Sequence, residues 1–502
     1  MSNKQFSTNL NPLVRQLNKN PKDFTKEDII QFIEDNEIKM LNFRYAGGDG
    51  RLKLLSFAVS DSVYLEQVLS QGERVDGSSL FSFVEAGSSD LYVIPRFRTA
   101  FIDPFAKLPT LCLLCSYYTK DGKPMEISPE YILKKAAKSF QAVTGMKFQA
   151  MGELEYYVVG EKEDHFLATD QKGYHESSPF TKYEDFRMEA MYLIACAGCM
   201  VKYGHSEVGN FTFNDKIYEQ NEIEFLVTDV EDAANQLIIA KWIIRKLAYR
   251  YGLDVTFAPK ITTGKAGSGM HIHTRIVKDG RNCMVTGGKL NDTAKKAIAG
   301  YLQCAPSLTA FGNTNPTSYF RLVPHQEAPT TICWGDRNRS VLVRVPLGWT
   351  VGDDMVANEN PMEKPVEMDG SSQKQTVEFR CPDCSADVYL LLAGLTVAAR
   401  NGFEMENALE FTEKTYVDAN IFHTENKEKA ASLNNLPASC WESAEMLDKQ
   451  REIYERHGVF PAHIIDGIIK DLKKFDDKNI RKELENSPDK MMELIKKYYY
   501  CG

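Results

Sequence analysis

The amino-acid sequence predicts an α+β protein with two domains. Its 502 residues exceed what one hydrophobic core usually organises. Short β-rich runs separated by glycine- and serine-rich turns fill the first quarter of the chain, whereas strands alternate with long helical stretches in the remainder. We therefore expect a strand-rich N-terminal domain with a leader helix over residues 1–125, and a larger domain with a C-terminal helical tail over residues 126–502.

The elements of the N-terminal domain follow from local patterns. Residues 28–36 predict an amphipathic lead-in helix. Residues 38–58 predict a hairpin, because two β-rich runs flank the turn-forming residues 47–50, Gly-Gly-Asp-Gly. Further strands are expected at residues 90–94 and 111–118.

The second domain is predicted to open with a helix at Ser128-Pro129-Glu130, where proline suits the first helical position. A charged helical tail is expected from Ala444 onward, and the polar, proline-bearing residues 355–375 predict a surface loop. Four long helices are expected between these points, at residues 184–203, 230–249, 292–305 and 388–404.

Composition excludes several classes of protein. A net charge of −9 argues against a nucleic-acid-binding face, which would be basic. Apolar runs are too short to span a membrane, and the first residues lack the apolar region of a signal peptide. The 11 cysteines are an odd number scattered over the chain, which is typical of reduced thiols. We therefore expect a soluble, cytoplasmic protein with no nucleic-acid or membrane partner.

Three strand-like segments carry metal-binding or charged side chains at a spacing of two residues, which places both side chains of a pair on one face of a strand. Taken alone, each pair is more often a solvated strand face or a hydrogen-bonded structural pair than a metal site. Together with Glu207 and Glu222 they suit two hard divalent cations that share an ATP phosphate and its acceptor. The pairs are Glu153 and Glu155, His271 and His273, and Glu378 and Arg380.

Nine motifs follow one another over residues 40–500: Val75-Asp76-Gly77-Ser78-Ser79, Glu153-Leu154-Glu155, His205-Ser206-Glu207-Val208, Gln220-Asn221-Glu222-Ile223, residues 267–273, residues 319–324, Glu327-Ala328-Pro329, Arg337-Asn338-Arg339-Ser340 and Glu378-Phe379-Arg380. In order and approximate spacing they resemble the signatures of type I glutamine synthetases. The resemblance implies an N-terminal β-grasp domain followed by a glutamine-synthetase-type catalytic domain.

The resemblance also implies two or more divalent metal ions per site, with ATP as a co-substrate. Mg²⁺ or Mn²⁺ fits better than Zn²⁺, because oxygen ligands dominate and no thiolate joins them. The first metal would be held by Glu155, Glu207 and Glu222, and the second by Glu153, His271 and Glu378.

Substrate contacts are implied in the same way. Arg321 and Arg380 would clamp the α-carboxylate of glutamate, since a guanidinium fork matches a planar anion. Gly267 would offer a backbone contact, and Arg339 would neutralise the transferred phosphoryl group. His273 and Arg344 would bind the nucleotide. An ammonium pocket, with Asp76 and Glu327 as catalytic groups, would comprise Asp76, Ser79, Tyr174, Glu207 and Glu327.

The implied reaction is ATP-dependent ligation of ammonia to the γ-carboxylate of L-glutamate through γ-glutamyl phosphate. Two alternatives stay open: a related γ-glutamyl–amine ligase, and a catalytically silent regulatory paralogue. Positions on the nucleotide side depart from the family pattern, which puts nucleotide choice and rate in doubt. These departures include Lys202, Arg275 and Thr376.

The resemblance implies a homo-oligomer of two stacked hexamers, with active sites between subunits and residues 495–501 gripping across the rings. Many bacterial members are inactivated by attachment of AMP to a loop tyrosine. The matching stretch, residues 418–423, has Phe422 at that place, which offers no oxygen to accept the nucleotide. The Cys381-Pro382-Asp383-Cys384 motif lacks a second pair at zinc spacing, so we interpret it as loop packing.

Overall fold

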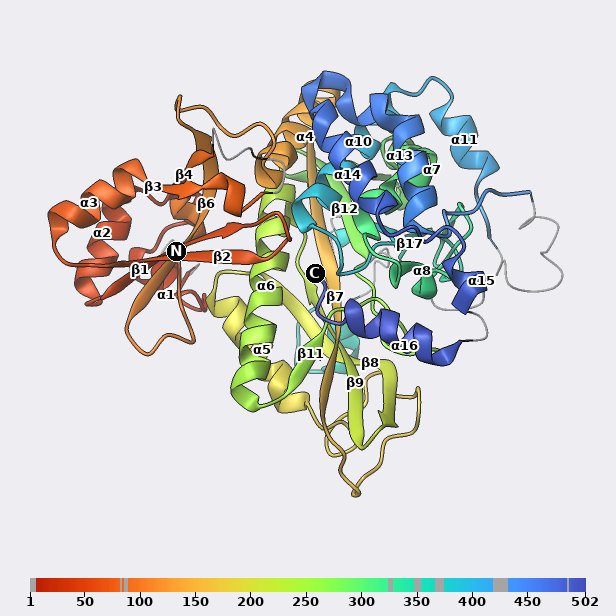
Figure 1. Ribbon diagram of the computed structural model, residues 1–502, viewed down its shortest axis with the longest axis horizontal. Coiled ribbons are helices and arrows are strands. Elements are labelled where there is room, and N and C mark those ends of the chain that lie inside the picture. The colour runs from red at the N-terminus through yellow and green to blue at the C-terminus, as the bar shows by residue number, and fades with distance from the viewer. Residues whose placement is uncertain are drawn as a thin grey trace.

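The computed structural model describes residues 6–81, 84, 89–323, 328–346, 354–365, 374–418, 432–484 and 487–502. A smaller domain, built around a mixed sheet, lies beside a larger one whose long sheet is flanked by helices (Figure 1). The α+β fold class predicted from the sequence is confirmed. Glu327 and Phe422 lie outside the described residues.

The smaller domain holds a six-stranded sheet in the order β2-β1-β6-β4-β3, with β5 paired to β6. The predicted hairpin is confirmed: β1 and β2 pair antiparallel from Met40 opposite Ala58 to Ala46 opposite Leu52. The sheet is mixed, because β1 also pairs in parallel with β6. Its strands are β1 (Met40–Ala46), β2 (Leu52–Ala58), β3 (Glu73–Asp76), β4 (Asp90–Pro95), β5 (Phe101–Ile102) and β6 (Thr110–Thr119).

Three α-helices cover this sheet: α1 (Pro12–Leu17), α2 (Lys26–Asp35) and α3 (Ser62–Gln71). Helix α2 begins at a capping box, in which the Thr25 hydroxyl accepts from the Asp28 N–H and the Asp28 carboxylate accepts from the Thr25 N–H. Its inner face buries Ile29, Phe32 and Ile33 in the core of the domain.

The larger domain is organised by β7 (Lys147–Glu161), a 15-residue strand that is buried along most of its length. The principal strand order is β16-β17-β18-β12-β7-β9-β8, and β10, β11 and β13 add to it. The other strands are β8 (Val201–Phe213), β9 (Lys216–Phe225), β10 (Thr228–Asp229), β11 (Asp254–Thr256), β12 (Ile272–Lys278), β13 (Arg281–Asn282), β16 (Trp334–Asp336), β17 (Val343–Val345) and β18 (Val377–Phe379), with a separate small hairpin of β14 (Val285–Thr286) and β15 (Lys289–Leu290).

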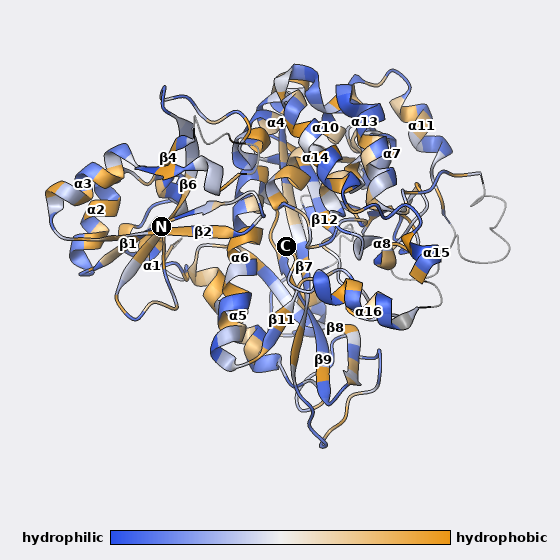
Figure 2. Ribbon diagram, viewed as in Figure 1, coloured by the Kyte–Doolittle hydropathy of each residue, from blue (hydrophilic) through white to orange (hydrophobic). Residues whose placement is uncertain are grey.

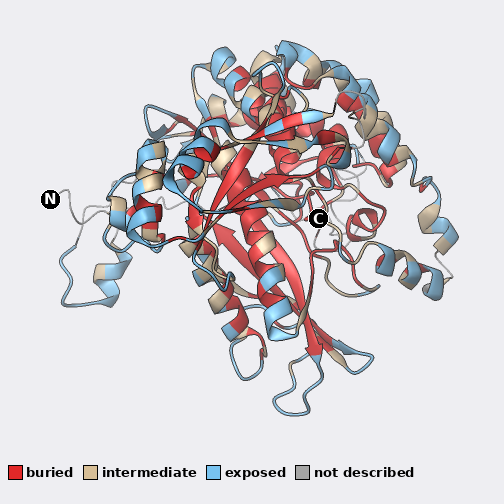
Figure 3. Cartoon of the chain, turned by 60° about the vertical axis from the view of Figure 1, so that its left-hand side comes forward, coloured by how far each residue is buried: buried red, intermediate tan, exposed pale blue. Residues whose placement is uncertain are grey.

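Helices pack against this sheet, and its central strands are buried (Figure 3). The outer helices carry hydrophilic residues interspersed with hydrophobic ones (Figure 2). Helix α6 packs against β7, and α10 packs against α7 and α4. The helices are α4 (Pro129–Thr144), α5 (Glu184–Cys196), α6 (Val230–Tyr251), α7 (Asp292–Gly312), α8 (Ser318–Arg321), α9 (Met355–Glu359), α10 (Val388–Glu404), α11 (Ala408–Lys414), α13 (Cys440–Glu455), α14 (Ala462–Lys473), α15 (Ile480–Leu484) and α16 (Pro488–Lys497).

Three expectations about these elements are corrected. The helix expected over residues 184–203 ends at Cys196, because Gly198 takes a positive φ of 84° and strand β8 begins at Val201. The helix expected to end at residue 305 continues through Pro306 to Gly312, held by packing against α10 and α13. The loop expected over residues 355–375 contains the short helix α9, capped by the Asp354 side chain.

The C-terminal segment binds its own chain. Arg245 Nη2 of α6 donates to the Cys501 carbonyl (3.0 Å), and the Tyr500 hydroxyl donates to Asp254 Oδ2 (3.0 Å). Thr256 donates to the Tyr499 carbonyl. Within one chain the end of this segment is held by α6 and β11, and the contact of residues 495–501 across rings stays a prediction.

Candidate active site

One face of the large sheet lines an open cavity of about 1590 Å³. The side chains of Met151, Glu153 and Glu155 reach this cavity from β7, since alternate residues of a strand share a face. The predicted site residues that line it are Glu153, Glu155, Tyr174, Glu207, Glu222, Gly267, His271, His273, Arg321, Arg339, Arg344, Glu378 and Arg380.

Strand register brings residues that are distant in sequence into rows across the sheet. One row runs from Glu155 on β7 to Glu222 on β9 and His205 on β8, each directly opposite the next. A second row joins Glu153, Glu224 and Tyr203 on the same three strands. On the other side of β7, a third row joins His273 on β12, Glu378 on β18 and Arg344 on β17.

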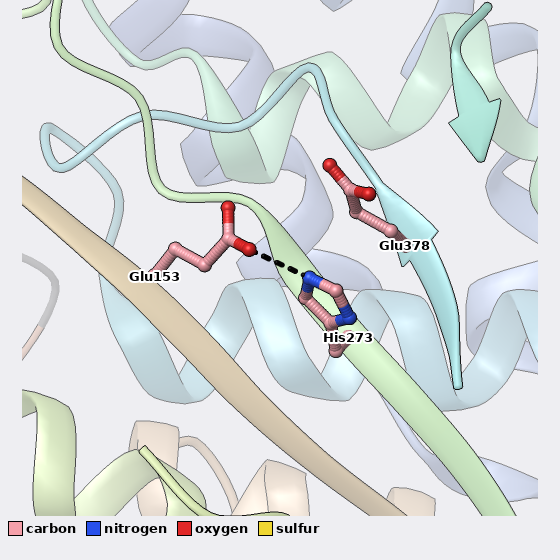
Figure 4. Close-up of side chains that lie close together, drawn as sticks. All are labelled: Glu153, His273 and Glu378. Atoms are coloured by element: carbon pink, nitrogen blue, oxygen red, sulfur yellow. Dashed lines mark hydrogen bonds and ion pairs between the residues drawn. The ribbon is translucent and has the colours of Figure 1, made fainter. Parts of the chain in front are cut away.

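One cluster of candidate ligands lies at the predicted second metal site. It contains Glu153, His273 and Glu378, whose ligand atoms lie within 4.8 Å of one another (Figure 4). Glu153 accepts hydrogen bonds from His273 Nε2 (2.8 Å) and His271 Nδ1 (2.7 Å). His271 Nδ1 also lies 3.6 Å from Glu378 Oε1. The structure thus places His273, assigned to nucleotide binding by the resemblance, beside the residues assigned to the second metal.

Charges in this cluster balance one another. Burial alone would raise the pKa of Glu153, but the two histidines hold it well below its ordinary value. Burial likewise opposes ionisation of Glu378, yet Arg380 lowers the pKa of that carboxyl. Glu378 forms ion pairs with Arg380 Nε (2.9 Å) and Arg344 Nη1 (2.9 Å). These contacts therefore favour the charged form of both carboxylates.

Another cluster of candidate ligands lies at the predicted first metal site. It contains His205, Glu207 and Glu222, again with ligand atoms within 4.8 Å of one another. Glu155, the third predicted ligand here, lies opposite Glu222, and its Oε2 accepts from the Gly269 N–H (2.8 Å) and Gln220 Nε2 (3.1 Å). Burial, followed by repulsion from neighbouring carboxylates, raises the pKa of Glu222 well above its ordinary value. Crowded, buried carboxylates of this kind fit a divalent cation, because a cation offsets both desolvation and mutual repulsion.

Sequence reasoning missed two residues of the site, His205 and Glu224. Glu224 approaches Glu153 and Glu222 within the same 4.8 Å limit and pairs with Lys202 Nζ at 2.6 Å. The sequence contained a signal for Glu224, because Glu222-Ile223-Glu224 repeats the spacing of two residues found in Glu153-Leu154-Glu155. His205 was part of a quoted motif, but only the strand register reveals that it lies opposite Glu222.

Arginine side chains occupy the wall of the cavity beside these clusters. Arg321 is buried, donates from Nη1 to the Cys381 carbonyl (2.8 Å) and packs against the backbone of Gly267 and Gly269. A Cβ at residue 267 would approach the Pro259 carbonyl to 2.5 Å, so glycine is required for this close approach. Fixed guanidinium groups next to carboxylate clusters suit an anionic substrate.

Asp76 and Ser79 lie on the smaller domain, outside the described lining of the cavity. Asp76 Oδ2 accepts from the Ser79 hydroxyl (2.7 Å), and hydrogen bonds from Ser79 and Ser78 lower the pKa of Asp76. The structure therefore does not bring these two residues to the metal-type clusters of their own chain. Tyr174 does reach the cavity and is half exposed.

The Cys381–Cys384 motif packs beneath the site. Both thiols are free and buried, and burial raises the pKa of Cys384 to about 12. Cys384 Sγ contacts the carbonyls of Glu155 (3.7 Å) and Gly269 (3.6 Å). These observations agree with the loop-packing interpretation. Separately, none of the described helices combines the length and apolar character needed to cross a bilayer.

A sheet face with carboxylates, imidazoles and arginines around one cavity is typical of a class of protein, the metal-dependent enzymes that act on anionic substrates. Comparison with known proteins identifies the family. The model of the glutamine synthetase catalytic domain matches residues 126–491, and that of the glutamine synthetase β-grasp domain matches residues 37–120. The chain belongs to the glutamine synthetase family and is a ligase of that family. The predicted order of a β-grasp domain followed by the catalytic domain is confirmed.

Individual relatives agree with this assignment. A glutamine synthetase of Clostridium saccharobutylicum is 30% identical over 442 residues, covering 86% of this chain and 91% of that protein. One of Pyrococcus furiosus is 30% identical over 428 residues, covering 84% and 88%. Among solved structures, Plasmodium falciparum glutamine synthetase superposes with a TM-score of 0.75 at 18% identity, covering 93% of this chain and 98% of that one. A GmaS–ADP complex gives a TM-score of 0.71 at 18% identity, covering 92% and 98%.

Proposed function

We propose that this protein ligates ammonia to the γ-carboxylate of L-glutamate, using ATP and passing through γ-glutamyl phosphate. The observation that carries the proposal is that two clusters of potential metal ligands and a set of arginines line the same cavity. The γ-carboxylate would attack the γ-phosphate of ATP, and the amine would then displace phosphate from the acyl phosphate. Exclusion of water during the reaction would protect that intermediate from hydrolysis.

The donor set fits Mg²⁺ or Mn²⁺, with two or more ions per site. Glu155, Glu207 and Glu222 would hold one ion, and Glu153, His271 and Glu378 the other. When bound, the ions would supply positive charge at the phosphate oxygens, as they do in other phosphoryl transfers.

The arginines would hold the anionic reactants. Arg321 and Arg380 would orient the α-carboxylate of glutamate, with Gly267 allowing its close approach. Arg339 and Arg344 would stabilise negative charge on the transferred phosphoryl group, with His273 on the nucleotide side.

The amine would enter beside Tyr174 and Glu207. Its proton must leave before attack, because only the neutral amine is a nucleophile. Asp76 and Ser79 would complete this pocket from a neighbouring subunit, together with Glu327. A head-to-tail contact of this kind closes into a ring when the rotation between subunits permits it, and we propose two stacked hexameric rings.

A γ-glutamyl–amine ligase is a second candidate. Beside the proposed amine pocket, the rings of Tyr174, His175 and His205 lie close together, with centroid distances of 4.3 Å from Tyr174 to His175 and 4.4 Å from His175 to His205. The face of a tyrosine ring attracts organic ammonium groups, so Tyr174 offers a surface for an alkylamine.

Phosphate release from purified protein, Mg²⁺–ATP, glutamate and a panel of amines tests these possibilities. Release with ammonia alone supports the proposal, and release that requires an alkylamine supports the second candidate. If no amine gives phosphate release, with Mg²⁺ or with Mn²⁺, both candidate activities are overturned and a catalytically silent paralogue remains.

A further inference from the structure

We propose that His205 is a nitrogen ligand of the first metal site, joining Glu207 and Glu222, so that this site favours a first-row transition ion over Mg²⁺. The inference rests on the proposed metal-dependent function and adds a ligand that the family resemblance did not supply. It follows from the hydrogen bonding of the imidazole, its position in the sheet and the residues around it.

The hydrogen bonds of His205 select one tautomer. Its Nδ1 lies 3.0 Å from the backbone carbonyl of Ser206, and because a carbonyl oxygen only accepts, Nδ1 carries the proton. Nε2 is then the ring nitrogen left to bind an ion. Metal-binding histidines in proteins characteristically donate their second ring N–H to a carbonyl or carboxylate in this way.

His205 Nε2, the second ring nitrogen, faces a carboxylate. His205 Nε2 lies 3.3 Å from Glu222 Oε1, and His205 Nδ1 lies 3.7 Å from Glu207 Oε2. This separation leaves both atoms in position to bind one ion between them. Donor atoms about 2.1 Å from one ion and at a right angle lie about 3 Å apart, which agrees with this separation.

The sheet and the surrounding rings hold the imidazole in place. His205 lies directly opposite Glu222 in the β8–β9 pairing, while Glu155 lies opposite Glu222 on the other side. The rings of His175 (4.4 Å), Tyr174 (5.3 Å) and Tyr203 (5.9 Å) pack around it, and only 12% of its side chain is exposed. The ligand is therefore preorganised, as a specific metal site requires.

A nitrogen donor changes which ion the site prefers. Mg²⁺ favours an all-oxygen environment, whereas affinity for nitrogen-containing sites rises along the first transition series from Mn²⁺ to Co²⁺. We therefore expect the first site to bind Mn²⁺ more tightly than Mg²⁺, and removal of the imidazole to reduce that preference.

The test uses the full-length protein with Mn²⁺ as the probe. In a background carrying Glu378→Ala and His271→Gln, which removes a carboxylate and the proposed nitrogen ligand of the other site, substoichiometric Mn²⁺ should show nitrogen modulation in pulsed electron paramagnetic resonance. Adding His205→Gln should abolish the modulation and weaken Mn²⁺ binding roughly tenfold or more, with a smaller change for Mg²⁺. His175→Gln is the matched control, because it removes a neighbouring imidazole outside the carboxylate cluster, and it should leave the modulation in place.

Unchanged modulation and unchanged Mn²⁺ affinity in the His205 variant would overturn the assignment. Equal losses in the His175 variant would also overturn it, since they would indicate a packing effect. Circular dichroism confirms that each variant is folded. A protein that shows the His205-dependent modulation yet releases no phosphate with any amine would retain this metal ligand while refuting the proposed function.

Discussion

Glu155 and Glu222 lie directly opposite each other on the neighbouring antiparallel strands β7 and β9. Both are buried, with 6% and 7% of their surface exposed. Like charges at such positions destabilise a sheet, and burial adds the cost of desolvation. We therefore expect a bound cation to stabilise the folded chain.

Thermal unfolding should reveal that sensitivity. Mn²⁺ or Mg²⁺ should raise the melting temperature above its value in a chelator, and an ion at a hundred times its Kd contributes about 2.7 kcal/mol. Glu222→Gln should lose most of this increase, because it removes a ligand and part of the repulsion. Glu161→Gln, at the exposed end of β7, should keep the increase. Identical melting in chelator and in metal would contradict the cation site.

Replacement of Glu155 or Glu378 by alanine should abolish ligase activity while the fold survives. Each change removes one carboxylate from a proposed metal site, and we expect a loss of about 10²-fold or more in phosphate release. Glu161→Ala, on the same strand as Glu155 but exposed, is the control and should retain activity. Wild-type rates in either variant would refute the metal-site assignment.

Subunit mixing should restore activity to a pair of inactive variants. Asp76 lies on the smaller domain, away from the cavity of its own chain, so we expect Asp76→Ala and Glu378→Ala to damage different halves of a shared site. Hybrid oligomers reassembled from the two variants should recover part of the phosphate release, since some sites combine two intact halves. Light scattering should show a dodecamer. A fully active monomer would refute the shared site.

Two glycines should be essential for stability at the crossing of α7 and α10. A Cβ at Gly300 would come within 1.9 Å of the Ala398 carbonyl, and one at Gly402 equally close to that of Lys296. We expect Gly300→Ala to lower the free energy of unfolding by roughly 3 kcal/mol.

The control for this overpacking is Gly467→Ala in α14, where an added Cβ meets no atom within 4 Å. That change should stabilise the protein by about 0.5–1 kcal/mol, because alanine is the better helix former. Chemical denaturation measures both effects. Equal stability of the Gly300 and Gly467 variants would show that the two helices can separate without cost.

Local sequence patterns predicted many elements correctly. The hairpin of β1 and β2, the helix beginning after Ser128 and the spacing-two pairs on β7 all follow from short-range signals of turn, cap and strand period. The helix after residue 184 was predicted too long, because an apolar run continues past Gly198 and only the backbone conformation at that glycine shows where it ends.

The sequence by itself determined the family, the fold class and most of the candidate ligands, because those depend on residue identity and order. The tertiary structure decided which of these side chains meet. His205 and Glu224 joined the site because antiparallel register sets one residue directly opposite another, a relation that no spacing along the chain encodes. Asp76 and Ser79 stayed outside the cavity for the same reason: proximity follows from how strands and domains pack, and the sequence order of motifs does not fix it.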